Sequence, residues 1–247
     1  MTAEPLLSVS HLSLRIQDHT ILKDISLEVQ AGEVVGLIGP NGSGKTTLFN
    51  VLSGFLKPTK GTVCLCGEDI THLSAPLRAR KGIGRVFQDF GIFRDMTLLE
   101  NILVAFESLT TDERRKIGDL RSATQETLAM VQLQHFAKKK AGSLSGGQMR
   151  LLEIARTFKG NKSLLLLDEP TAGVSPKMTH QIADLIRSLR REGRTVLIIE
   201  HDLPFIAKIC DRIIVLDVGE VALEGSPSEV QSSKKLKEIY FGADPTT

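Results

Sequence analysis

Alternating apolar and polar residues at the start of the chain predict an antiparallel sheet. The stretches LLSVSHLSLRI and TILKDISLEV place apolar side chains at nearly every second position, and the polar residues QDH separate them. Alternation of this kind, with turn residues between two runs, is typical of paired antiparallel strands that have one solvated face. We therefore expect the chain to begin with such strands.

Uninterrupted apolar runs replace the alternation after residue 33 and predict a parallel sheet. VVGLI leads into a glycine-rich loop and the helical segment KTTLFNVL, and the runs LLLL, TVLII and RIIVL follow later in the chain. Short runs without polar positions are typical of strands that are covered on both faces. Between LLLL and TVLII we expect a helix from Pro176 to Glu192, with Ser175 as its N-cap and Gly193 beyond its end.

Helical patterns interrupt this order of strands and helices near residues 90–143. Thr97 and Glu100 form a predicted capping box. The apolar side chains that follow recur with helical spacing, at Leu99, Ile102, Leu103 and Phe106. The polar segment TTDERRKIGD predicts a solvated bend before the next helix. The predicted fold class is therefore α/β, with a mainly parallel sheet as its core, an antiparallel sheet at its start and a helical insertion.

Composition narrows the function classes without selecting one. The chain has 247 residues, 41% of them hydrophobic, which is enough for one large domain or a domain with a lobe. The formal net charge of +2 is too balanced for a nucleic-acid binder, which usually carries a concentrated basic face. The N-terminus lacks the pattern of a signal peptide, and no apolar run approaches the ~18 residues of a membrane span. If the protein works at a membrane, we expect another chain to cross it.

The segment GPNGSGKTT has the spacing of a phosphate-binding loop. Its glycines let backbone N–H groups curl around an anion, and the helix that starts there directs its positive end to the same point. Lys45 is expected to reach the β and γ phosphates, and the Thr46 hydroxyl to bind Mg²⁺. The expected nucleotide contacts are Gly39, Pro40, Asn41, Gly42, Ser43, Gly44, Lys45, Thr46 and Thr47.

Polar residues directly after two buried strands predict a reactive centre beside this loop. Asp168 and Glu169 follow the run LLLL, and His201 follows TVLIIE. The carboxyl ends of parallel strands border the crevice in which α/β proteins bind ligands. We expect Asp168 to hold Mg²⁺, Glu169 to orient and deprotonate an attacking water, and His201 to donate a hydrogen bond to the γ phosphate. Gln88 follows a shorter apolar strand, and its position alone leaves its role open.

A second glycine-rich helix start, in SLSGGQMRLLEIAR, carries no lysine. Ser145 can cap a helix that begins around Gly146, and Gly147 permits a close approach to the backbone. The positive end of the helix dipole suits an anion, but without a lysine this site cannot hold a nucleotide well alone. We expect the phosphate-binding loop to lie across the molecule, so this helix end would cover the γ phosphate bound by a second, similar subunit. A plain helix cap with flexible glycines is the alternative.

Together these segments resemble the ATP-binding cassette (ABC) ATPases over nearly the whole chain. GPNGSGKTT resembles the Walker A loop, LSGGQ the signature, LLLLDEP the Walker B strand and His201 the switch histidine, all in family order. The resemblance implies a P-loop NTPase fold, the cofactors ATP and Mg²⁺, and nucleotide contacts from Ser145, Gly146, Gly147 and Gln148. It also identifies Gln88 with the Q-loop, as a catalytic residue that binds Mg²⁺ or water and senses a membrane partner.

The resemblance also implies how the single ABC ATPase domain is divided. A RecA-like core with the antiparallel β subdomain is expected at about 1–88 and 157–247. A helical subdomain is expected at about 89–156.

The flanking segments resemble one branch of the family, the ATPase subunits of branched-chain amino acid importers. GIGRVFQDFGIFRDMTLLENILVA and AGSLSGGQMRLLEIAR carry this similarity. It implies a peripheral protein at the cytoplasmic face of the inner or plasma membrane. The implied partners are a second ATPase subunit, identical or related, transmembrane permease subunits, and an extracytoplasmic substrate-binding protein. Urea- or amide-type importers and the lipopolysaccharide-export ATPase have similar segments and are alternatives.

Two other classes agree less well with the sequence. A soluble ABC ATPase that acts on DNA or ribosomes would be expected to have long coiled coils or two cassettes in one chain. This sequence has no sustained heptads and a single cassette. A P-loop kinase would have no function for the segment LSGGQ.

The sequence departs from the family pattern at two positions. Family members usually stack adenine on an aromatic side chain of an early strand, whereas no aromatic residue precedes Phe49 here and the matching position is Ile16. Because π-stacking is worth on the order of 1 kcal/mol, we expect modest ATP affinity and poor discrimination between ATP and GTP. The segment AGVSP keeps Ser175 as a helix cap but lacks the usual acidic residue, which predicts weaker or asymmetric communication between two subunits.

Overall fold

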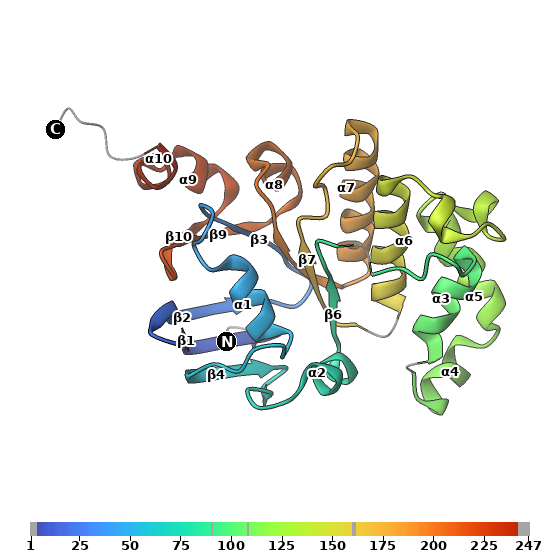
Figure 1. The fold of residues 1–247 in the computed structure, drawn as a ribbon, viewed down its shortest axis with the longest axis horizontal. Coiled ribbons are helices and arrows are strands. Elements are labelled where there is room, and N and C mark those ends of the chain that lie inside the picture. The colour runs from blue at the N-terminus through green and yellow to red at the C-terminus, as the bar shows by residue number, and fades with distance from the viewer. Residues whose placement is uncertain (1–3, 90, 108, 160–161, 242–247) are drawn as a thin grey trace.

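Two β-sheets form the centre of the structure, a computed structural model that describes residues 4–89, 91–107, 109–159 and 162–241 (Figure 1). The smaller sheet is antiparallel and has the strand order β2-β1-β4-β5. Its strands are β1 (Leu7–Ile16), β2 (His19–Val29), β4 (Lys60–Leu65) and β5 (Glu68–Asp69). The two alternating stretches at the start of the chain form β1 and β2, so the prediction of antiparallel strands there is confirmed.

The larger sheet has six strands in the order β10-β9-β3-β8-β7-β6. Its neighbouring strands are parallel except for β10, which pairs with β9 in the antiparallel direction at one edge. The strands are β3 (Val34–Ile38), β6 (Ile83–Val86), β7 (Leu164–Asp168), β8 (Thr195–Ile199), β9 (Arg212–Asp217) and β10 (Glu220–Gly225). This topology confirms the predicted mainly parallel core.

Each face of the larger sheet is covered, which explains the uninterrupted apolar runs. Val35 and Leu37 of β3 belong to the cluster shared with the antiparallel sheet and with helix α1 (Lys45–Leu52). Val34 and Ile38 belong to the cluster on the opposite face. Helices α6 (Gly146–Lys159), α7 (Pro176–Arg191) and α8 (Leu203–Ile209) contribute to that second cluster. Since both faces of the inner strands are buried, these runs are apolar except at the first residues of β8 and β9, Thr195 and Arg212.

The predicted helical insertion lies at the right of Figure 1, beside α6. It contains α3 (Leu98–Glu107), α4 (Thr111–Ile117), α5 (Leu120–Met130) and the 3₁₀ turns η1 (Gln134–Phe136) and η2 (Ala141–Ser143). The prediction of a bend in TTDERRKIGD is wrong, because most of this segment forms α4. Ile117 packs against the apolar cluster, and the Arg114 guanidinium donates to the carbonyl oxygens of Phe106 and Glu107. These tertiary contacts stabilise a helix that has little apolar pattern of its own.

The ends of α7 agree with the predicted signals. The Ser175 hydroxyl accepts a hydrogen bond from the Met178 amide, Pro176 occupies the first position, and the helix ends one residue before its C-cap Glu192. The other helices are α2 (Ala75–Lys81), α9 (Pro227–Ser232) and α10 (Lys234–Phe241). Within the described residues, no helix is both long enough and apolar enough to cross a membrane.

The parallel sheet determines where the polar loop residues meet. In the register of β7 and β8, Asp168 is paired with Ile199, so the residues that follow both strands emerge at the same edge. Strand β3, next to β8, ends at Ile38, and the phosphate-binding loop follows it. Strand β6, next to β7, leads toward Gln88. The phosphate-binding loop, Gln88, the Asp168–Glu169 pair and His201 therefore converge on one edge of one sheet. The other predicted site residues lie elsewhere, Ile16 at the end of β1 and Ser145 to Gln148 at the start of α6.

Candidate functional site

Two glycines set the shape of the loop between β3 and α1. Gly39 has φ 151°, and a Cβ atom there would lie 2.0 Å from the carbonyl oxygen of Leu216. Gly44 has φ 102°, and its Cβ would lie 2.9 Å from a methyl carbon of Leu22. Both positions combine a backbone conformation that favours glycine with a neighbour that excludes a side chain. The curled loop therefore depends on these two residues.

Lys45 lies within this loop. Its Nζ donates to the carbonyl oxygens of Gly39 and Pro40, each at 2.8 Å. The residue is only 6% exposed, and burial lowers the pKa of its ammonium group, while the nearby carboxylates of Glu169 and Asp168 oppose that shift. The ammonium is thus held at the phosphate-binding loop and close enough to the acidic pair to interact with it electrostatically.

The other loop residues differ in their exposure. Ser43 is buried and its amide donates to the Pro40 carbonyl at 3.2 Å. Pro40 and Thr47 are half-buried, whereas Asn41, Gly42 and Thr46 are exposed. The Thr46 hydroxyl therefore lies on the solvent side at the start of α1, where a bound nucleotide and its metal could reach it.

The structure brings Gln88, Glu169 and His201 together. The His201 Nε2 atom lies 2.8 Å from Glu169 Oε1, and because an ionised carboxylate only accepts, the imidazole donates this hydrogen bond. Gln88 Nε2 donates to Glu169 Oε2 at 3.4 Å. Glu169 has φ 47°, and its amide donates to the Ile199 carbonyl at 3.0 Å. This left-handed backbone directly after β7 fixes the direction of the carboxylate.

Asp168 is the buried member of the acidic pair, at 3% exposure. Burial raises the pKa of its carboxyl group, and the guanidinium of Arg85, with Nη2 3.3 Å from Asp168 Oδ2, opposes the shift. No cluster of three or more His, Cys, Asp or Glu side chains that could hold a metal occurs among the described residues. Mg²⁺ is a hard cation that binds oxygen ligands, usually one or two carboxylates together with water and phosphate oxygens. Asp168 supplies a carboxylate, Thr46 a hydroxyl and Gln88 an amide oxygen. The residues present therefore fit this ion.

The second glycine-rich segment forms a capped helix start. The Ser145 hydroxyl accepts from the Gln148 amide at 3.4 Å, and the Gln148 side chain accepts from the Ser145 amide at 3.0 Å. Ser145 and Gly146 are exposed at the start of α6. Gly147 is buried, and a Cβ there would lie 2.5 Å from Cγ of Met178. The close approach predicted at Gly147 is thus made by α7 of the same chain.

Ile16 is the last residue of β1 and is 44% exposed. It pairs with His19 across the turn between β1 and β2. This location leaves an aliphatic side chain accessible beside the start of β2, and its contact with adenine stays a prediction.

Sequence reasoning missed a buried ion pair on α6. Arg150 Nη1 lies 2.8 Å from Glu153 Oε2, and both side chains are 2% exposed. Arg150 also donates to the carbonyl oxygens of Phe87 and Gln88, and Glu153 accepts from the Gly91 amide at 3.0 Å. This pair joins the helix that follows the signature to the segment that carries Gln88. The signal in the sequence was an Arg and a Glu three residues apart on a helix, a spacing that ordinary surface pairs share.

Glu153→Ala is expected to lower the free energy of unfolding by about 3–5 kcal/mol, because buried Arg150 would lose the carboxylate that pairs with it. Asp184→Ala is the matched control. It breaks an ion pair with Arg187 of the same helical spacing, but the side chains are 45% and 75% exposed. We expect this control to cost less than about 1 kcal/mol in urea-induced unfolding. Equal losses in the two variants would contradict the role of the buried pair.

Glu200 is a second residue that the sequence did not single out. It is 4% exposed and follows β8, directly before His201. Its carboxylate accepts from the Thr171 amide at 2.8 Å and from the Thr171 hydroxyl at 2.6 Å. Glu200 thereby ties the loop after β7 to the end of β8, which keeps Glu169 and His201 on adjacent, connected segments.

The arrangement combines phosphate binding with the means to activate water. The loop and Lys45 supply N–H groups and one positive charge for phosphates. Of the carboxylates named above at this edge of the sheet, Glu169 alone is partly accessible to solvent. It is hydrogen-bonded to His201 and Gln88. A carboxylate in such a position can accept a proton from water, and the imidazole can donate to a transferring phosphoryl group.

Comparison with known proteins agrees with this chemistry. Residues 22–172 match the ABC transporter family. The chain is 39% identical to the high-affinity branched-chain amino acid transport ATP-binding protein BraF of Pseudomonas aeruginosa, covering 97% of this chain and 99% of that protein. It is 35% identical to the lipopolysaccharide export system ATP-binding protein LptB of Haemophilus influenzae, over 96% of this chain and 97% of that protein.

Solved structures agree as well. The ADP conformation of MJ1267, an ATP-binding cassette of an ABC transporter, superposes with a TM-score of 0.86 at 33% identity, over 98% of this chain and 100% of that one. A dimeric, post-hydrolysis state of the cassette MJ0796 with ADP and Pi superposes with a TM-score of 0.75 at 30% identity, over 90% and 98% of the two chains. The expected cassette fold is thereby confirmed. This chain belongs to the ABC transporter family and is one of its ATP-binding, ATP-hydrolysing subunits.

Proposed function

We propose that this ATPase subunit pairs with a second cassette and drives the uptake of branched-chain amino acids through membrane subunits. The observation that supports the pairing is the exposed start of α6, at Ser145 and Gly146. This helix N-terminus is suited to an anion, but its segment has no lysine to hold a nucleotide. In Figure 1, α6 lies between the larger sheet and the helical insertion, whereas α1 lies near the antiparallel sheet. A second chain can present its α6 to the phosphates that this chain binds.

The residues divide the work of hydrolysis between them. The loop of Gly39–Thr47 and Lys45 bind the phosphates, Glu169 orients and deprotonates water, and His201 donates to the γ phosphate. Mg²⁺ held by Thr46, Asp168 and Gln88 would neutralise phosphate charge. Ser145, Gly146, Gly147 and Gln148 complete the site of the partner chain. The pairing is supported by the similarity to a cassette whose dimeric state is known.

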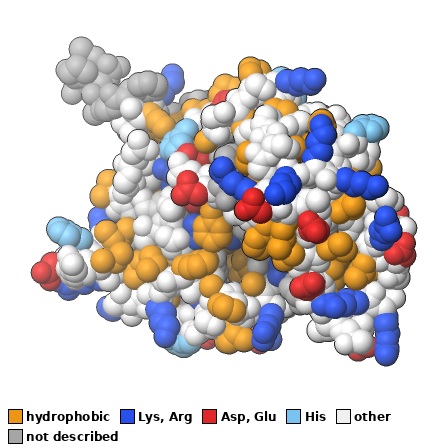
Figure 2. All heavy atoms as spheres, turned by 45° about the vertical axis from the view of Figure 1, so that its right-hand side comes forward, with side chains coloured by type: hydrophobic (Ala, Val, Ile, Leu, Met, Phe, Trp, Pro, Cys, Tyr) orange, Lys and Arg blue, Asp and Glu red, His pale blue; other side chains and the backbone are white. Residues whose placement is uncertain are grey.

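The membrane subunits are proposed to dock on the apolar surface next to Gln88. Phe87, directly before Gln88, is 38% exposed, and Phe55 is 58% exposed. Phe93 and Met96, which lead into α3, are exposed by 44% and 38%. Figure 2 shows apolar side chains gathered across the face that includes the right-hand side of Figure 1, around a hollow and with charged side chains scattered about them. Exposed apolar groups concentrated in this way mark protein interaction surfaces.

The proposed location is the cytoplasmic face of the inner or plasma membrane, held by these membrane subunits. An extracytoplasmic binding protein is the proposed source of the amino acid. Within the cassette, the helical subdomain of about 89–156 is proposed to move relative to the core of about 1–88 and 157–247 during each ATP cycle. The buried pair Arg150–Glu153 would carry such a motion to the Gln88 segment.

The substrate can be tested with the transporter complex that co-purifies with this chain, reconstituted in liposomes. We expect ATP hydrolysis to rise when leucine-loaded binding protein is added, and not with lipopolysaccharide or urea. This expectation follows from the similarity to BraF over nearly the whole of both chains. Stimulation by lipopolysaccharide would instead favour the function of LptB, and co-purification without any membrane protein would contradict a transport role.

A further inference from the structure

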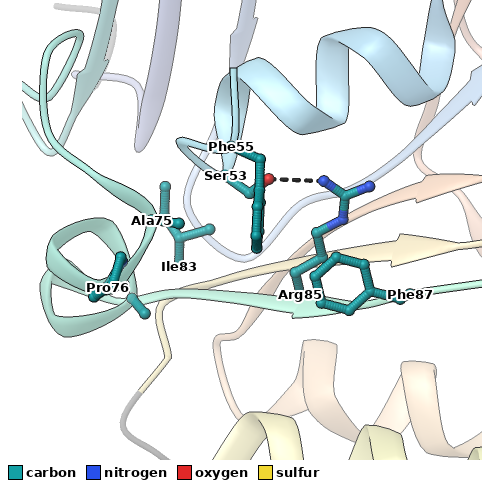
Figure 3. Close-up of a pocket in the computed structure, with 8 residues that line it drawn as sticks. Ser53, Phe55, Ala75, Pro76, Ile83, Arg85 and Phe87 are labelled. Carbon is teal, nitrogen blue, oxygen red and sulfur yellow. Dashed lines mark hydrogen bonds between the residues drawn. The ribbon is translucent and has the colours of Figure 1, made fainter. Parts of the chain in front are cut away.

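A pocket beside Gln88 has apolar walls and a buried arginine at its side. It encloses about 340 Å³ between the end of α1, helix α2 and strand β6. Its lining consists of Ser53, Phe55, Ala75, Pro76, Ala79, Ile83, Arg85 and Phe87 (Figure 3). The rings of Phe55 and Phe87 lie edge to face with centroids 5.5 Å apart. An aliphatic or aromatic side chain is the kind of group that this space accepts.

The guanidinium of Arg85 lies against these rings. Its Cζ atom is 4.7 Å from the ring centroid of Phe87, 5.8 Å from that of Phe55 and 5.9 Å from that of Phe49. The Arg85 side chain is 6% exposed, so the two partly exposed rings of Phe55 and Phe87 shield the cation from solvent. Any group that moves these rings therefore changes the surroundings of the cation.

The same guanidinium also reaches the nucleotide site. Nη1 donates to Asn50 Oδ1 at 2.6 Å and to Ser53 Oγ at 2.8 Å, both near the end of α1. Nη2 donates to Asp168 Oδ2 at 3.3 Å, which is the longest of these contacts. Among the described residues, the Nε–H group of Arg85 has no acceptor although it is buried. The contact with Asp168 is thus the longest of the set and the only one to a charged group, and one donor is available for a new partner.

We propose that Arg85 is a positioning residue that links an occupant of this pocket to the magnesium-binding carboxylate Asp168. The occupant is an apolar side chain of a membrane subunit, so this identity rests on the proposed function. Entry of that side chain moves Phe55 and Phe87, and the guanidinium follows the rings away from Asp168. In the arrangement seen here, Arg85 neutralises Asp168 and holds it in a hydrogen bond.

The consequence is a change in metal affinity. A guanidinium within hydrogen-bond distance competes with a divalent cation for the same carboxylate and repels that cation. When Arg85 moves away, Asp168 regains its full charge for Mg²⁺. Docking at the pocket therefore raises the affinity of the nucleotide site for its metal, without any contact between the membrane subunit and the nucleotide.

The test uses Mn²⁺ as a spectroscopic probe, titrated into the full chain with saturating ADP and followed by electron paramagnetic resonance. Arg85→Gln is expected to bind Mn²⁺ about five- to tenfold more tightly than the unchanged chain, because the competing charge is gone. Arg85→Lys keeps the charge and is expected to stay close to the unchanged chain. Equal shifts in both variants would show that Arg85 only maintains the structure, and would overturn the proposal.

A filled pocket can be imitated without any membrane subunit, which separates this test from the proposed function. Ala79 lines the pocket from α2, so Ala79→Phe directs a ring into it. Leu77→Phe is the matched control, because Leu77 is on the same helix, 43% exposed and not part of the lining. We expect Ala79→Phe to tighten Mn²⁺ binding and Leu77→Phe to leave it unchanged.

The double variant decides whether the effect passes through Arg85. In the Arg85→Gln background, Ala79→Phe is expected to cause no further tightening of Mn²⁺ binding, because the guanidinium through which it would act is absent. Additive effects, a weakening of Mn²⁺ binding in either variant, or no difference between Ala79→Phe and Leu77→Phe would each overturn the proposal. Failure of the transport assay with these shifts intact would change the identity of the occupant and not the role of Arg85.

Discussion

Glu169→Gln is expected to lower the ATP turnover of the paired cassettes by about 10²–10⁴-fold, the usual size of a lost general base. The substitution keeps the length of the side chain, and its amide oxygen can still accept from His201. Gln88 can turn its own amide and accept from the new NH₂ group. What it removes is the ability to accept a proton from water. Since Lys45 and its loop are untouched, nucleotide binding should be retained, and we expect the ATP-bound pair to accumulate.

Phosphate release and size-exclusion chromatography with ATP together check this expectation. Glu192→Gln is a suitable control, because it makes the same chemical change at the exposed C-cap of α7. We expect the control to hydrolyse ATP normally and to show no stable ATP-dependent pair. Unchanged turnover in Glu169→Gln would remove this carboxylate from its role, and a loss of nucleotide binding would point to a structural role instead.

The residues at the ends of buried strands were predictable from the sequence for a physical reason. Parallel strands bring their carboxyl ends to one edge, so the polar residues one or two positions after an apolar run are placed there by the fold itself. Glu169 and His201 are examples, and the structure joins them by a hydrogen bond of 2.8 Å. The glycine-rich loop was equally predictable, because its backbone conformation at Gly39 and Gly44 requires residues without a side chain.

Buried charges on regular elements were not predictable in the same way. Arg85 is the third residue of the four-residue strand β6, and nothing near it in sequence indicates that its partners are Asn50, Ser53 and Asp168. Its burial depends on two phenylalanine rings from different segments. Such contacts arise only when distant parts of the chain pack together. From the local sequence pattern alone, Arg85 therefore resembles an ordinary polar residue of a strand.

Helix α4 and the Gly147 contact illustrate the same limit. The polar segment before α5 becomes helical because Arg114 and Ile117 find partners on α3 and in the apolar cluster. Gly147 was expected to permit a close approach to its backbone, and the side chain that makes this approach is Met178 of α7. In both cases the sequence indicates the local preference, and the tertiary partner decides the result.

Ser145→Arg is expected to lower turnover by about 10²-fold, similar to the loss of one donor that stabilises a transition state. Ser145 is exposed at the start of α6, and the arginine would place a long, charged side chain where the nucleotide of the partner chain is proposed to lie. The phosphate-binding loop of the same chain is unchanged, so its affinity for an ATP analogue should stay the same. Asp119→Arg is the matched control, because it puts the same side chain at the exposed N-cap of another helix, α5, where only the cap, worth about 1 kcal/mol of helix stability, is lost.

Mixing two inactive variants gives the sharper measurement. Lys45→Ala disables the loop, and Ser145→Arg disables the start of α6. In a mixed pair, one composite site keeps Lys45 from one chain and Ser145 from the other, so random mixing should restore roughly a quarter of the unchanged activity. A mixture that stays inactive would mean that each chain completes its own site. Because each variant lacks a different half, recovery on mixing can only come from a site that two chains share.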